Sequence, residues 1–162
     1  MSILPKKEPV RHIADYIGML HASEQELADA FLTVAKEHKE EPDIFSNCNL
    51  LSDWSARHVE GLKPFIERYS EKKALEPRLL RHGLFHGPRP GGYGLVRDLQ
   101  DLLLLASENH STWVILLQAA RGLRDEDFKT LCMTSDQEAR RQVSWLETRI
   151  KQSAAQPLNM PV

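Results

Sequence analysis

The sequence predicts an all-α fold, a four-helix bundle with a long crossover connection between its second and third helices. Four long segments carry apolar residues at spacings of three and four, which is the pattern of amphipathic helices. The segment 71–94 between the second and third of them breaks this pattern and is long for a simple helical hairpin. A connection of that length can cross from one end of a bundle to the other, which leaves the helices on either side of it roughly parallel.

Composition is that of one folded domain over residues 1–162. Hydrophobic residues make up 41% and charged residues 27% of the chain, values typical of globular proteins. The net charge of −2 lacks the basic field that phosphate binding needs, so we expect no nucleic-acid partner. We also expect a cytoplasmic protein without a membrane span, because no apolar run approaches ~20 residues and the N-terminus lacks a signal peptide's apolar region. Cys48 and Cys132 lie on apolar stripes and are expected to be reduced core residues.

The first helix is predicted over residues 9–38, with Pro9 in its first turn. Its apolar positions are Val10, Ile13, Ile17, Leu20, Leu27, Phe31 and Val34. The same spacing places Glu24 on this apolar face, near the middle of the helix.

The second helix is predicted over residues 43–70, with Asp43 as its N-cap. Its apolar positions are Cys48, Leu51, Leu62, Phe65 and Tyr69. Ser55 and His58 continue the same stripe between them, so the middle of this buried face is polar.

The crossover 71–94 contains EKKALEPRLLRHGLF, with a short helix expected over 77–82, followed by the glycine- and proline-rich loop HGPRPGGYG. His82 and His86 in this region could bind an anion or a surface metal. A flexible crossover explains them equally well, and we favour that interpretation.

The third helix is predicted over residues 95–123. Its strongest stripe is Val96, Leu99, Leu103, Ala106, His110, Trp113, Leu117 and Ala120. His110 stands in the middle of this stripe, whereas Glu108 lies roughly 140–160° away from it. The LLLL run makes the helix apolar almost all round.

The fourth helix is predicted over residues 126–153, and the tail 154–162 is expected to be flexible. Its stripe is Phe128, Cys132, Ser135, Ala139, Gln142, Leu146 and Ile150. Gln142 lies near the centre. The three tryptophans of the chain are expected to fill core and interface positions rather than bind a cofactor.

Polar residues thus recur near the midpoint of every predicted helix. In antiparallel helices of similar length the midpoints meet, so Glu24, Ser55, His58, His110 and Gln142 are expected at one level of the bundle. Buried polar groups cost a few kcal/mol unless they are hydrogen-bonded or bound to a metal. One such residue on each helix indicates a shared polar layer.

The chain resembles the ferritin-like superfamily in the segments SEQELADAF, SARHVEGLKPFIERY, QAARGLRD and RRQVSWLETRIKQ and in the long crossover. The resemblance implies a di-iron or di-manganese centre, with a Glu on the first and third helices and Glu-x-x-His on the second and fourth. Glu24 and His58 match this pattern. The second-helix glutamate is replaced by Ser55. The third helix offers Glu108 or His110.

The fourth helix offers Glu138, paired with Ser135 or Arg141, and neither pair is Glu-x-x-His. The metal-ligand set is therefore degenerate, because two divalent ions need more carboxylates than this layer supplies.

Three functions follow from the polar layer. We favour a hydrogen-bonded pair of Glu24 and His58, completed by Ser55 and Gln142, in a non-catalytic structural or interaction module without a cofactor that forms a homodimer through a helix face. The alternative is a redox or oxygen-handling protein with one iron or manganese ion bound by Glu24, His58 and His110. A third possibility is an organic ligand in the space left by the missing metals.

Overall fold

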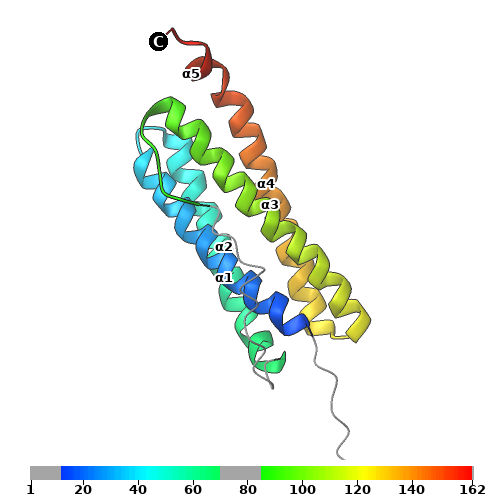
Figure 1. Ribbon diagram of the computed structural model, residues 1–162. Helices are drawn as coiled ribbons and strands as arrows, with labels where there is room; N and C mark the ends of the chain where they lie inside the picture. The colour runs from blue at the N-terminus through cyan, green and yellow to red at the C-terminus, as the bar shows by residue number, and fades with distance from the viewer. Residues whose placement is uncertain (1–11, 70–84, 162) are drawn as a thin grey trace, which may run out of the picture.

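The computed structural model describes residues 12–69 and 85–161, and these ranges form helices and no strand (Figure 1). The all-α expectation is thereby confirmed. The helices are α1 (Ile13–Glu37), α2 (Pro42–Tyr69), α3 (Gly91–Leu123), α4 (Glu126–Ser153) and the short α5 (Ala155–Asn159).

The four long helices lie side by side in one bundle (Figure 1). Helix α1 packs against α2 and α3, and α3 packs against α4, while the contact between α2 and α4 is smaller. The colours in Figure 1 show that α1 and α4 run upward and that α2 and α3 run downward, so α2 and α3 point the same way. The path of the crossover stays a prediction, because residues 70–84, including the expected helix over 77–82, lie outside the described residues.

The helix boundaries differ from the expected ones at four places. Helix α1 begins at Ile13 instead of residue 9, and the expected start at Pro9 lies outside the described residues. Helix α2 begins at Pro42, before Asp43, because proline suits the first position of a helix. Helix α3 begins at Gly91 instead of residue 95, so part of the expected loop is helical. The tail expected to be flexible contains α5. Helix α4 has the predicted acidic start, where the Asp125 side chain accepts a hydrogen bond from the backbone N–H of Phe128.

Gly94 allows the segment before α3 to approach the helix closely. The chain before the helix folds back on this residue, and a Cβ placed here would lie 2.6 Å from the carbonyl oxygen of Arg89. Only glycine allows this approach. Local propensity predicts a loop at GGYG, but tertiary packing decides the structure there.

The core consists of two apolar clusters along the bundle. The upper cluster contains Leu27, Phe31, Ile44, Leu51, Leu99, Ala106 and Leu146, among others. The lower cluster contains Ile17, Leu20, Leu62, Phe65, Trp113, Phe128 and Ala139, among others. Cys48 lies in the upper cluster and Cys132 in the lower one, both as free buried thiols. Burial raises the pKa of each thiol to about 12.

The helices within the described ranges are all too short or too polar to cross a membrane.

Candidate functional site

A buried polar layer separates the two apolar clusters. We define this polar layer by Glu24 on α1, Ser55 and His58 on α2, Asn109 on α3 and Gln142 on α4. Each is at most 3% exposed. Each interrupts an apolar face between a residue of one cluster and a residue of the other. Polar side chains are therefore buried at one level on all four long helices.

Glu24 is the centre of the polar layer. Its Oε1 accepts a hydrogen bond from Nε1 of Trp113 at 2.7 Å and lies 3.1 Å from Nδ1 of His58. The His58 and Trp113 rings meet edge to face, with their centroids 5.4 Å apart. One carboxylate oxygen thus joins α1 to α2 and to α3. Sequence reasoning treated Trp113 as core filler and missed this bond, because the spacing of an indole ring does not reveal where its N–H points.

Ser55 and Gln142 join α2 to α4. Nε2 of Gln142 donates to Oγ of Ser55 at 2.9 Å and to the carbonyl oxygen of Leu51 at 3.0 Å. The side chains that carry this link were predicted from the sequence. Ser55 stands where the ferritin-like pattern has a glutamate. Here its hydroxyl oxygen accepts a hydrogen bond from the Gln142 amide instead of binding a metal.

The third-helix member of the polar layer is Asn109, and the expectation that His110 lies in the middle of the buried face is wrong. Asn109 is fully buried and its Oδ1 accepts a hydrogen bond from Oγ of Ser23. The His110 side chain is 27% exposed, with Nε2 3.0 Å from Oδ1 of Asp136 but poorly aligned for a hydrogen bond. The reason is the LLLL run, which makes two adjacent stripes on α3 equally apolar.

The two further carboxylate candidates lie beside the polar layer. Glu138 accepts a hydrogen bond from Nη2 of Arg57 at 3.0 Å through Oε2, and its Oε1 lies 3.9 Å from Nε2 of His58. Glu108 is partly buried on α3. Its backbone carbonyl oxygen accepts a hydrogen bond from the hydroxyl of Thr112 at 2.9 Å.

Several buried atoms of the polar layer have no hydrogen-bond partner within the described protein. They are Glu24 Oε2, His58 Nε2, Asn109 Nδ2 and Gln142 Oε1. Buried polar atoms of this kind cost about 1–3 kcal/mol each when unpaired, and bound water commonly satisfies them in proteins.

The residues present do not fit the two-metal centre that the resemblance implies. Within residues 12–69 and 85–161, no three His, Cys, Asp or Glu side chains are grouped so that they could hold a metal ion. Oε1 of Glu24 is engaged by Trp113 and His58. Ser55 supplies no carboxylate, and His110 is directed to Asp136.

A second buried polar cluster lies near the upper end of the bundle and was not predicted. Oδ2 of Asp98 lies 2.8 Å from Nε2 of His38 and accepts the backbone N–H of Arg89 at 2.8 Å. The Arg89 guanidinium donates to Asp101 at 2.9 Å and to Asp98 at 3.0 Å, and these hydrogen bonds raise the pKa of Arg89. The cluster joins residues before α3 to α1 and α3. The only sequence signal is two aspartates three positions apart.

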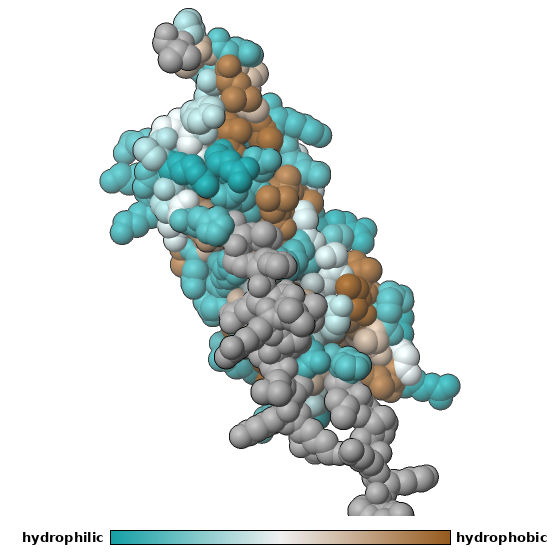
Figure 2. All heavy atoms as spheres, viewed as in Figure 1, coloured by the Kyte–Doolittle hydropathy of each residue, from teal (hydrophilic) through white to brown (hydrophobic). Residues whose placement is uncertain are grey.

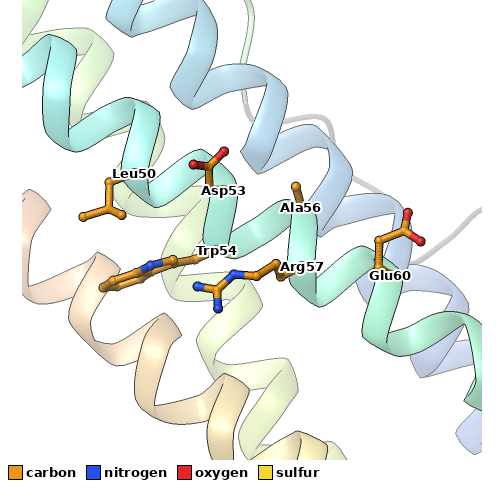
Figure 3. Close-up of a pocket in the computed structure, with 6 residues that line it drawn as sticks. All are labelled: Leu50, Asp53, Trp54, Ala56, Arg57 and Glu60. Carbon is orange, nitrogen blue, oxygen red and sulfur yellow. The ribbon is translucent and has the colours of Figure 1, made fainter.

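The outer face of α2 carries an open hollow of about 490 Å³ (Figure 3). Its lining residues are Leu50, Asp53, Trp54, Ala56, Arg57 and Glu60. Trp54 and Arg57 extend toward α4, where Arg57 meets Glu138 (Figure 3). The hollow lies outside the polar layer and contains no member of it.

Comparison of the chain with protein-family models, with curated proteins and with solved structures finds no match.

Proposed function

We propose that this protein is a non-catalytic, ferritin-like bundle that has lost a metal centre and acts as a structural or interaction module, forming a homodimer through a helix face. The observation that supports the proposal is the Glu24 carboxylate. Its Oε1 is bound by nitrogen groups of His58 and Trp113, from two other helices, in the place where the resemblance implies a metal. A buried group that is hydrogen-bonded in this way fixes how helices align.

Two further features agree with the proposal. Ser55 and Gln142 close the polar layer between α2 and α4 with hydrogen bonds of their own. Helices α2 and α3 point the same way, as a ferritin-like crossover between them requires (Figure 1). Together these features describe a layer that sets helix register, with its carboxylate used as a hydrogen-bond acceptor.

Metal analysis tests this proposal. Protein purified from medium supplemented with iron and manganese should contain far less than one equivalent of either metal, and a chelator should leave its melting temperature unchanged. His58→Leu should leave the metal content at the same low level. One or two equivalents of bound metal, with a melting temperature that falls on chelation, would overturn the proposal.

The unpaired buried atoms favour a second candidate function, the binding of one iron or manganese ion. No three His, Cys, Asp or Glu side chains among the described residues are grouped to hold a metal as they stand, so this candidate requires Glu138 to move toward His58. Nε2 of His58 and Oε2 of Glu24 have no hydrogen-bond partner among the described residues, and Oε1 of Glu138 lies 3.9 Å from that nitrogen. Imidazole and carboxylate are ligands that suit both metals. Under this candidate, His58→Leu and Glu138→Gln should both abolish binding of added Fe²⁺ or Mn²⁺ in equilibrium dialysis, whereas under the first proposal the wild-type protein retains neither ion.

A further inference from the structure

The outer face of α3 is unusual because it carries no charge along most of its length. Its exposed residues between Asp98 and Ala120 are Gln100, Leu104, Ser107, Ser111, Val114, Ile115 and Gln118. Leu104 and Ile115 are 48% and 47% exposed. Hydrophobic residues gather along α3 on the face shown in Figure 2. Every other long helix has charged residues on the corresponding part of its exposed face, so α3 alone presents an uncharged one.

The residues of this α3 face repeat symmetrically about Asn109. Gln100 and Gln118 each stand nine positions from it. Nine positions are about two and a half helical turns, so both glutamines point away from the buried side of α3. Leu104 and Val114 stand five positions from Asn109 on either side.

Ser107 and Ser111 complete the symmetry, two positions on either side of Asn109. Ile115 stands six positions after Asn109, and half-buried Leu103 stands six positions before it. The order from one end to the other is therefore amide, two aliphatic residues, hydroxyl, hydroxyl, two aliphatic residues, amide. A face with this order matches a second copy of itself in the antiparallel direction.

We propose that the α3 face of one chain packs against the α3 face of a second copy, antiparallel, with the two-fold axis passing between the two helices at the level of Asn109. This inference rests on the homodimer in the proposed function and names its interface. In this arrangement Leu104 packs on the partner's Val114, and Ser107 meets the partner's Ser111. The small serines at the axis allow the helices to approach closely, and a two-fold interface requires such self-complementarity.

The charged residues at the edges and ends of the face are also placed symmetrically. Half-buried Glu108 and His110 flank opposite edges, so in the antiparallel pair each lies on the same side as its own counterpart in the partner. At the ends, Arg97 donates to Gln100 at 2.7 Å, and Arg121 donates to Gln118 at 3.5 Å. Arg97 of one copy therefore approaches the partner's Arg121.

These two arginines are exposed, and Arg97 also pairs with Asp101 at 3.2 Å. Their repulsion is modest, yet it limits affinity. The uncharged strip is about 27 Å long. Its small size indicates a weak dimer, with a dissociation constant in the micromolar range.

The first test is the oligomeric state of the full chain by sedimentation velocity, from about 1 to 200 µM. Wild type should show reversible dimerisation. Leu104→Asp should weaken it at least tenfold, because it buries a carboxylate against an aliphatic partner. The matched control is Leu32→Asp on α1, which replaces a leucine that is 47% exposed and should leave dimerisation unchanged.

The second test is a charge reversal at the end of the interface. Arg121→Glu faces the partner's Arg97 and should tighten the dimer about threefold at low salt. Arg141→Glu, an exposed arginine on α4, serves as the control and should change nothing.

Cysteine cross-linking tests the register. A mixture of Leu104→Cys chains and Val114→Cys chains should form intermolecular disulfides at least fivefold faster than either variant alone, because identical positions lie about 15 Å apart along the antiparallel pair. The native thiols of Cys48 and Cys132 are buried, which keeps the background low.

The outcomes separate this inference from the broader proposal. A dimer that Leu104→Asp and Leu32→Asp affect equally, or equal cross-linking of the mixture and the single variants, overturns the α3 interface and leaves the homodimer standing. A chain that stays monomeric at about 200 µM overturns both the α3 interface and the homodimer. Neither result depends on metal content, which tests the lost metal centre separately.

Discussion

Trp113→Phe should destabilise the protein more than its lost volume explains. The substitution keeps an aromatic ring in the core but removes the N–H that binds Oε1 of Glu24 at 2.7 Å. Trp113 is fully buried, so no solvent replaces the missing donor. A hydrogen bond to a carboxylate contributes about 1.5–3 kcal/mol, and the smaller ring adds about 1 kcal/mol of lost packing. We expect a total loss of about 2.5–4 kcal/mol.

Urea unfolding followed by circular dichroism at 222 nm measures this loss, because the helix signal does not depend on the tryptophan itself. Trp54→Phe is the matched control. Trp54 packs partly buried against the upper cluster and makes no hydrogen bond to any described residue, so its substitution should cost about 1 kcal/mol.

A double-mutant cycle with Glu24→Leu isolates the hydrogen bond from the packing. In the Glu24→Leu background, Trp113→Phe should cost only about 1 kcal/mol, since the acceptor is already absent. The coupling energy between the two positions should therefore be about 1.5–3 kcal/mol. A coupling below about 0.5 kcal/mol would refute the idea that Glu24 and Trp113 form a stabilising pair in the polar layer.

Two other predictions concern the lower and upper ends of the bundle. Burial acts to raise the pKa of Asp125, but hydrogen bonds from Arg68 and two other groups outweigh it and lower that pKa below 3.8. The stabilisation by this N-cap is therefore present above about pH 4 and is lost as the pH falls through the lowered pKa. Asp125→Ala should cost about 1 kcal/mol at pH 7, and urea unfolding at pH 3 should show a smaller difference from wild type. Gly94→Ala should lower the urea midpoint by the equivalent of about 1–3 kcal/mol, because its Cβ would lie 2.6 Å from the Arg89 carbonyl oxygen. Gly92→Ala, whose Cβ meets nothing closer than 3.8 Å, should be neutral or stabilising, and equal effects of the two substitutions would contradict the close approach at Gly94.

The sequence located the polar layer well on three helices. On these helices the apolar residues repeat at helical spacing and define a single buried face. The polar residues that stand on this face are Glu24, Ser55, His58 and Gln142. Burial at these positions follows directly from an amphipathic pattern. The bond between Ser55 and Gln142 also follows, because both face one interior and have complementary groups.

The sequence could not locate the polar layer on the third helix. Four consecutive leucines leave the buried face ambiguous by about one position, and His110 was chosen where Asn109 is buried. The role of Trp113 depends on the direction of one N–H, which only tertiary packing determines. The cluster of His38, Asp98 and Arg89 depends on a chain segment folding back at Gly94. Such non-local contacts have no periodic signal.

X-ray diffraction from crystals soaked in Fe²⁺ or Mn²⁺, with anomalous data collected at each metal's absorption edge, shows whether the polar layer binds a metal or only aligns the helices. We expect no anomalous peak in the polar layer. We also expect Oε1 of Glu24 to lie within hydrogen-bonding distance of both Nδ1 of His58 and Nε1 of Trp113. An anomalous peak bound by Glu24 and His58, with the Trp113 hydrogen bond broken, would contradict the claim that this layer serves to align the helices.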